Sequence, residues 1–294
     1  MKKVTKTVAV LIILFTLFIS TPFTVIHSAI FNSNNTNAQI TSSSTIKEFD
    51  TIEDAATYLR KKMVKREHII SFKINKPYYK SLPKVIFDKA VEDRKSSSSS
   101  EGDYLLANWN GYSANVKYGS NYSKITYNMK YLTTYKEEKA VDKQVKKILD
   151  DLNVYNKSDY TKIKAVHDYV VKNIHYDYNY KNRSSYNAIV NKKCVCQGFG
   201  SITYKMLKEL DVGVRYVVGT ANNTSHAWNI VKINSTWYNI DNTWDENSSN
   251  SNEISYKYFL KGSSDFYYHN RGDKYNTSSF KKAFPTAKKS YKKN

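Results

Sequence analysis

The sequence predicts an α+β fold divided into two domains. Segments whose apolar residues recur at helical spacing are separate from short runs in which aromatic and β-branched residues recur as they do in strands. The chain has 294 residues, which is enough for a sizeable core and for two domains. We expect a smaller N-terminal α+β domain at residues 47–135 and a second domain at residues 136–294, which ends in a basic C-terminal tail.

The first residues have the features of a secretory signal peptide, which we assign to residues 1–29. Three lysines precede an apolar run from Val8 to Ile19, and Ser28-Ala29 supplies small residues for cleavage. Ala38 is a second cleavage position. We therefore expect the mature protein to be secreted or associated with the cell envelope.

An uncleaved membrane anchor is the alternative, because Val8–Ile26 is nearly long enough to span a bilayer. Residues 30–46 follow and are rich in Asn, Ser and Thr without periodicity, so we expect a flexible spacer there.

The chain is strongly basic, with a formal net charge of +20. One explanation of this charge is a solvated, Lys-rich surface. The other is a functional one, in which the charge attracts the protein to anionic cell-envelope polymers. The last fourteen residues, Lys281–Asn294, hold six Lys and no acid, so electrostatic anchoring should be strongest there. No sequence motif for nucleic-acid binding supports a nucleic-acid partner.

Secondary-structure signals in the N-terminal domain begin with a helix. Asp50 can cap this helix, with Glu53 three residues later. Ile52 and the apolar residues that follow share one face, as they do in a helix. The remaining segments are predicted to be a strand, a loop and a pair of strands: His68–Ile74, Ser96–Ser100 and Tyr112–Tyr131.

Two helices open the second domain. Thr134 and Glu137 form a capping box ahead of an apolar stripe, and another helix follows Ser158. His167 and Asp168 lie beside the stripe of this second helix. We interpret them as solvated helix residues rather than functional ones.

Both cysteines of the chain lie one residue apart, at Cys194 and Cys196. A disulfide between them would close a loop of one residue and would constrain almost none of the unfolded chain. Phe199–Leu210 is apolar at helical spacing, so Cys196 should lie at a helix N-terminus, where amides and the helix dipole favour a thiolate. A small buried core residue is the alternative for Cys196, and Cys194 is interpreted as a bystander.

A predicted hairpin lies downstream of a strand at Val214–Val218. Its strands, Ser225–Ile233 and Thr236–Trp244, flank a two-residue turn at Asn234-Ser235. In this register His226 and Asp241 fall on one sheet face as diagonal neighbours, together with Trp228 and Thr243.

A helix-start thiol, an imidazole and a carboxylate are the groups that covalent acyl transfer requires. Taken singly, His226 could be a packed histidine and Asp241 a turn-capping acid. Their combination with Cys196 favours catalysis.

The motifs around these residues resemble the transglutaminase-like superfamily over roughly Val141–Asp245. They are Val195-Cys-Gln-Gly-Phe199, Ser225-His-Ala-Trp-Asn229 and Trp237-Tyr-Asn-Ile-Asp-Asn-Thr-Trp-Asp245. The resemblance implies Cys196 as nucleophile, His226 as base and Asp241 as orienting acid. It also implies a papain-like core, in which the helix that bears the nucleophile packs on an antiparallel sheet. Asn242 stands where the family often has Pro. The tail from Tyr256 to Leu260, with His269, resembles that of secreted bacterial members.

The resemblance implies a secreted cysteine acyltransferase that forms Gln–Lys isopeptide bonds or hydrolyses amides on cell-envelope proteins. Protein or peptide amides would be its substrates. A cysteine peptidase and a noncatalytic wall-binding module are the alternatives. We expect no cofactor and leave calcium dependence open. A metal site at Cys194, Cys196 and His226 is disfavoured, because their spacing lacks the paired C-x₂₋₄-C pattern of zinc sites.

Overall fold

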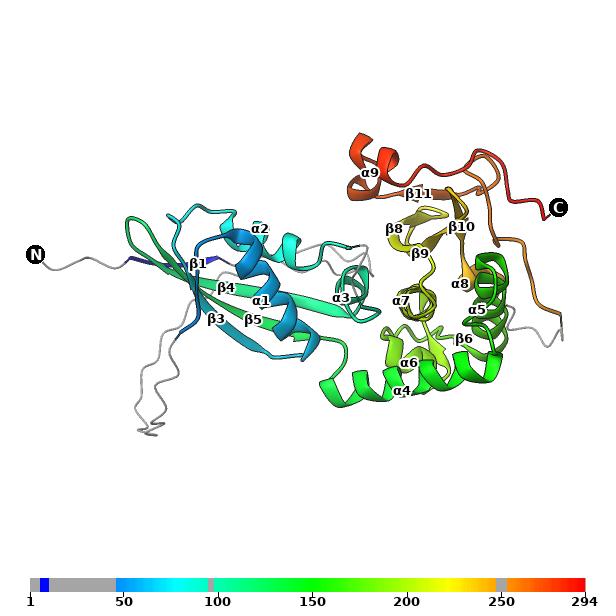
Figure 1. Ribbon diagram of the computed structural model, residues 1–294, viewed down its shortest axis with the longest axis horizontal. Helices are drawn as coiled ribbons and strands as arrows, with labels where there is room; N and C mark the ends of the chain where they lie inside the picture. Colours follow the sequence, from blue (N-terminus) through cyan, green and yellow to red (C-terminus); the bar gives the residue numbers. More distant parts are fainter. Residues whose placement is uncertain (1–5, 11–45, 95–97, 247–252, 294) are drawn as a thin grey trace, which may run out of the picture.

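The computed structural model describes residues 6–10, 46–94, 98–246 and 253–293 of the chain. Figure 1 shows two halves side by side, each with its own sheet, joined by the long helix α4 (Tyr135–Leu152). Helices and antiparallel strands are largely segregated, so the predicted α+β class is confirmed. Most of the predicted signal peptide and spacer lies outside the described residues.

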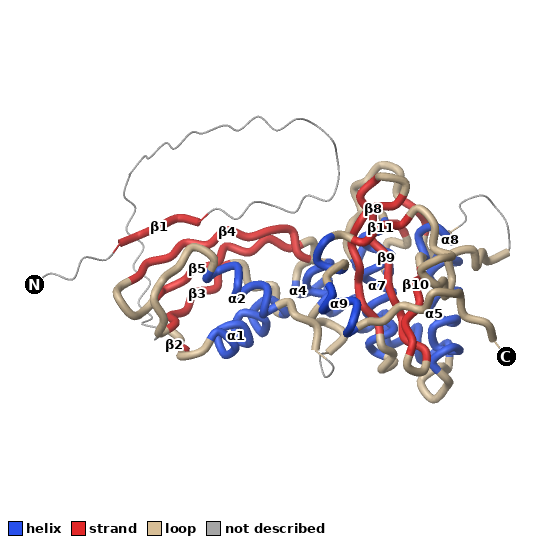
Figure 2. Tube along the Cα trace, turned by 90° about the horizontal axis from the view of Figure 1, so that it is seen from above, coloured by secondary structure: helices blue, strands red, loops and turns tan. Residues whose placement is uncertain are grey.

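A five-stranded sheet forms the N-terminal half, and Figure 2 shows its strands running alongside one another. The order is β1-β4-β5-β3-β2, and only the β2–β3 pair is parallel. Strand β1 lies within the predicted signal peptide and pairs with the edge of β4. The five strands are Lys6–Val10, Glu48–Phe49, Ile69–Ile74, Trp109–Tyr118 and Ser123–Tyr131.

Helices α1 (Ile52–Val64) and α2 (Leu82–Ala90) share a hydrophobic core with this sheet, because their apolar stripes and the inward residues of β3, β4 and β5 are buried together. The predicted cap of α1 is wrong by one residue. Thr51 caps the helix by accepting a hydrogen bond from the Asp54 amide at 3.1 Å. The Asp50 carboxylate is used elsewhere, since it accepts a hydrogen bond from Asn75 at 2.8 Å.

The C-terminal half is built around α7 (Cys196–Glu209), most of whose residues are buried. Helices α3 (Asp103–Ala107), α4, α5 (Asp159–Asn173) and α6 (Ser185–Ile189) surround it. The capping box predicted for α4 and the start predicted for α5 are confirmed. Helix α3 comes from the N-terminal half, yet it contributes to the core around α7.

Tight packing around the first turn of α7 depends on two glycines. A Cβ at Gly198 would lie 2.5 Å from Cβ of Cys194, and a Cβ at Gly200 would lie 2.8 Å from the Tyr216 ring. The two-stranded parallel pair β6 (His175–Tyr176) and β7 (Lys193–Cys194) leads directly into this turn.

The second sheet is antiparallel, with the order β10-β9-β8-β11. Its strands are Val214–Ala221 (β8), Thr224–Ile233 (β9), Thr236–Ile240 (β10) and His269–Arg271 (β11). Ile233 pairs with Thr236, so the predicted hairpin register is confirmed. Strand β8 runs past its predicted end, because Gly219 lets β11 approach; a Cβ there would lie 2.0 Å from the Asn270 carbonyl oxygen.

The end of the second hairpin strand was predicted wrongly. Strand β10 stops at Ile240, and Asp241 caps a short helix, α8 (Asn242–Asp245). Thr243 is therefore in a helix rather than in the strand.

An outer layer covers the face of this sheet opposite α7 and contains η1 (Asp273–Tyr275) and α9 (Ser278–Ala283). The basic C-terminal segment begins in this layer and ends against α5 and the core around α7. The Trp237 amide donates to the Pro285 carbonyl at 3.3 Å, and the Tyr291 amide donates to the Leu260 carbonyl at 3.0 Å. The Tyr291 ring also stacks on Tyr160, 5.5 Å between centroids. Along the described ranges, none of the helices combines the length and apolar character needed to cross a membrane.

Candidate active site

Cys196 is the first residue of α7, and Val195 is its N-cap. The predicted helix start is thereby confirmed. The residue is 1% exposed, and the rings of Tyr176 and Tyr216 and the Arg183 guanidinium lie close enough to interact with it electrostatically. The thiol therefore lies in a buried site at the start of α7, where the first backbone N–H groups have no partner within the helix.

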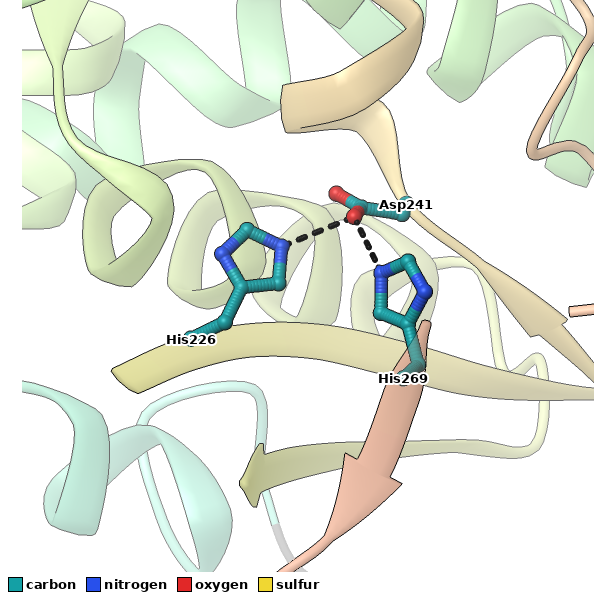
Figure 3. A group of neighbouring side chains, drawn as sticks. All are labelled: His226, Asp241 and His269. Atoms are coloured by element: carbon teal, nitrogen blue, oxygen red, sulfur yellow. Dashed lines mark hydrogen bonds and ion pairs between the residues drawn. The ribbon is translucent and has the colours of Figure 1, made fainter. Parts of the chain in front are cut away.

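His226 of β9 and Asp241 point toward each other, as Figure 3 shows. The distance from His226 Nε2 to Asp241 Oδ2 is 2.8 Å, and both side chains are buried. Since a carboxylate only accepts, Nε2 carries a proton, which leaves Nδ1 available for the hydrogen bond between this ring and Cys196. The three predicted site residues are thus brought together.

The charges in this group are strongly coupled. Burial acts to lower the pKa of His226, but the Asp241 charge and hydrogen bond, helped by a hydrogen bond to Cys196, outweigh it and raise that pKa to about 10. Burial acts to raise the pKa of Asp241, but the two imidazoles around it hold that pKa well below its usual range. These shifts favour an imidazolium at His226 and a carboxylate at Asp241.

His269 was not predicted as a site residue, and it is the second imidazole on Asp241 (Figure 3). Its Nε2 lies 3.0 Å from Asp241 Oδ2, and its Nδ1 lies 2.9 Å from the Tyr267 carbonyl oxygen. Its two ring nitrogens therefore lie between a backbone carbonyl oxygen and the Asp241 carboxylate, both of which accept hydrogen bonds. The only sequence signal was the resemblance of the tail around His269 to related tails.

The Asp241 carboxylate also holds the backbone. Its Oδ1 accepts from the amides of Thr243 at 3.0 Å and Trp244 at 3.3 Å, which makes it the N-cap of α8. Oδ1 therefore fixes the carboxylate while Oδ2 receives the two imidazoles.

His167 is a second correction to the sequence analysis, because its side chain is fully buried rather than solvated. Nε2 lies 3.1 Å from Asp245 Oδ2, and Nδ1 lies 3.1 Å from Asp168 Oδ1. Burial acts to lower the pKa of His167, but the two carboxylates outweigh burial and raise it. Asp245 is the last residue of α8, so His167 ties α5 to the helix that Asp241 caps.

Cys194 lies beneath the first turn of α7 against Gly198. It is fully buried, and burial raises the pKa of its thiol well above the usual value. This environment favours a packing role.

In the described part of the chain, one group of side chains could offer atoms to a metal ion: His226, Asp241 and His269, whose candidate atoms lie within 4.8 Å of one another. The same atoms form the hydrogen bonds just described. The arrangement is already satisfied as an acid–base group.

Helix α3 of the N-terminal half supports the residue next to the thiol. Gln197 donates from Nε2 to the Ala107 carbonyl at 2.7 Å and accepts from Arg183 Nε at 3.1 Å. One helix turn away from these contacts, the buried Asp103 carboxylate accepts from Arg215 Nε at 2.7 Å.

Comparison with known proteins gives a family match. Residues 146–242 match the model of the transglutaminase-like superfamily. A comparison with curated proteins gave no match.

Two solved structures are similar. One is described as a TGase, with 16% identity, 72% of this chain and 62% of that chain covered, and a TM-score of 0.36. The other is a proposed cysteine protease from Cytophaga hutchinsonii, with 18% identity, 44% and 56% covered, and a TM-score of 0.31. The chain thus spans about three fifths of their lengths. Both TM-scores are below 0.5, so the assignment rests on the family match.

Proposed function

We propose that this chain, whose residues 146–242 match the model of the transglutaminase-like superfamily, transfers acyl groups from protein amides through Cys196, His226 and Asp241. The observation that carries this proposal is the 2.8 Å bond from His226 Nε2 to Asp241, which leaves Nδ1 for the thiol at the start of α7. A packing histidine would need neither partner.

The proposed reaction begins with a thiolate and an imidazolium. Cys196 Sγ attacks the carbonyl carbon of a Gln side-chain amide, and the carbon–nitrogen bond breaks as His226 gives its Nδ1 proton to the departing ammonia. The product is a thioester on Cys196. A Lys amine or a water molecule then attacks the thioester, His226 takes the proton, and the thiolate is restored.

Asp241 keeps the ring of His226 oriented through both proton transfers. It remains a carboxylate because its Oδ1 is held by two backbone amides. Substrate must displace groups that cover Cys196, since the side chain is almost fully buried.

The test is incubation of the mature chain with an amine probe and a Gln-containing protein. Probe incorporation supports a transferase, released carboxylate without incorporation supports an amidase, and new N-termini support a peptidase. Cys196→Ala should abolish every product, whereas Cys194→Ala is the matched control and should retain activity. Products that survive in Cys196→Ala would refute the proposal.

We also propose that the mature protein acts outside the cell and is held at the envelope by its positive charge. The motive is the net charge, which is +20 for the whole chain and +17 without the three Lys of residues 1–29, together with the six Lys of Lys281–Asn294. Deleting that segment would remove packed residues such as Tyr291, so the test replaces its six Lys by Gln. Release at lower salt is expected, since exposed charges are screened over ~8 Å at physiological ionic strength. Retention that does not change with salt would refute it.

A further inference from the structure

A hollow of about 480 Å³ lies between the second sheet and the outer layer. Trp228 of β9 and Asn239 of β10 form its floor, while β11 and α9 supply residues to its walls. Figure 1 shows these two outer elements over the same end of the sheet. Cys196 is not among the lining residues, so the hollow is distinct from the position of the thiol.

Arg271 is a partly buried cation in this hollow. Its Nη2 donates to Asn239 Oδ1 at 3.1 Å and to Thr286 Oγ1 at 2.8 Å, and both acceptors are neutral. Across the described residues, no carboxylate forms an ion pair with it. Burial lowers the pKa of Arg271, and no acid offsets this effect. The guanidinium is therefore desolvated without a counter-ion.

Arg215 shows how this chain otherwise treats a buried guanidinium. Its Nε and Nη2 donate to the two oxygens of Asp103 at 2.7 and 3.1 Å. This bidentate pair raises the pKa of Arg215 despite burial. Arg271 carries the same guanidinium group, but its Nη2 donates to two neutral side chains, and a hollow lies beside it instead of an acid.

The rest of the lining fits an anionic ligand. Lys281 adds a second positive charge, Asn270 and Asn276 add amide groups, and none of the lining residues is acidic. Trp228 and Phe266 provide aromatic surface next to these polar groups. A guanidinium next to aromatic side chains suits a ligand in which an oxyanion is attached to an apolar group, because the guanidinium can donate two parallel hydrogen bonds to the oxyanion.

We propose that this hollow binds a small oxyanion group, a carboxylate or a phosphate, on Arg271, with the remainder of the ligand against the aromatic walls. His269 lines the same hollow and bonds Asp241, so the bound ligand lies beside the proposed acid–base group. This binding site is additional to the proposed acyl transfer and does not depend on it.

The test is calorimetric titration of the mature chain with benzoate and with inorganic phosphate, at ionic strength held constant with NaCl. At least one probe should bind saturably; binding of benzoate alone assigns the carboxylate, and binding of phosphate alone assigns the phosphate. Arg271→Gln should weaken binding roughly tenfold or more, as expected for loss of a charged hydrogen-bond partner. Lys281→Gln should weaken binding less.

The matched control is Lys282→Gln, the next residue of α9, which is exposed and does not line the hollow. It should bind like the parent protein. If Arg271→Gln does not fold, Arg271→Lys keeps the charge, removes the fork and should still weaken binding. Absence of saturable binding by either probe, full binding by the Arg271 variant, or equal loss in Lys282→Gln would overturn the proposal.

Discussion

At the scale of the residue, interactions converge on Asp241. Its Oδ1 caps α8, and its Oδ2 accepts from both His226 and His269. Every partner of this carboxylate is a donor, which is why it must remain charged. A neutral residue of the same size cannot replace it in both roles.

Asp241→Asn should therefore lose activity and some stability. In the Ser-His-Asp template a comparable change lowers turnover about 10⁴-fold. The carboxamide has one acceptor oxygen, so its NH₂ group must face a donor, and the lost bonds should cost about 1–3 kcal/mol of unfolding free energy. Turnover and urea unfolding measure the two effects. Normal turnover would mean that another residue orients His226.

The raised pKa of His226 makes a prediction about stability and pH. Because its pKa in the folded state, about 10, is above its unfolded value of about 6.5, its contribution is fully present below pH 6.5 and is lost as pH rises toward 10. The stability difference between the parent protein and His226→Gln should shrink across this window. Denaturant unfolding at several pH values measures it, and a constant difference would show that His226 is not held as an imidazolium.

At the scale of the element, the sequence predicted what depends on near neighbours. The capping box of α4 and the register of the β9–β10 hairpin require only residues a few positions apart. The cap of α1 was missed because Asp50 is drawn away by Asn75, a residue 25 positions later. The end of β10 was missed because Asp241 continues the alternating strand pattern in the sequence. Its role as a cap becomes clear only when its backbone amide partners are known.

His167 shows the same limit, because its partner Asp245 is 78 residues away. His167→Gln should remove the ionic contact between His167 of α5 and Asp245 of α8. We expect about 3–5 kcal/mol lower unfolding free energy, as for loss of one partner from a buried ion pair, and reduced turnover through displacement of Asp241. Lys172→Gln, near the exposed end of α5, is a control that should change neither. Unchanged stability in His167→Gln would show that the contact is not structural.

At the scale of the whole molecule, the two halves share contacts around the nucleophile helix. Tyr104 and Ala107 of α3 lie in the core around α7, and Asp103 pairs with Arg215 across 112 positions of sequence. Pairs this distant leave no local pattern, so the sequence could not predict the contacts between the two halves. His269 was missed as a partner of Asp241 for the same reason, since β11 brings it to the site only in the folded sheet.

A fragment of residues 136–294 should therefore fail to fold as the full chain does. It lacks α3 and leaves Arg215 without Asp103 and Gln197 without the Ala107 carbonyl. We expect broadened unfolding and loss of turnover, with the chain from residue 47 to 294 as the control. A fragment with full activity would show that the N-terminal half does not support the site.

The central claim is that Cys196 forms a thioester with a protein or peptide amide, and its most direct measurement is intact-protein mass spectrometry during turnover. After incubation with a Gln-containing peptide and no amine, the mass of the protein should increase by the mass of the peptide minus one ammonia. Fragmentation should place this adduct on Cys196. We predict that Cys194→Ala retains the adduct and that Cys196→Ala lacks it. An adduct mapped to Cys194, or one that persists in Cys196→Ala, would contradict the account.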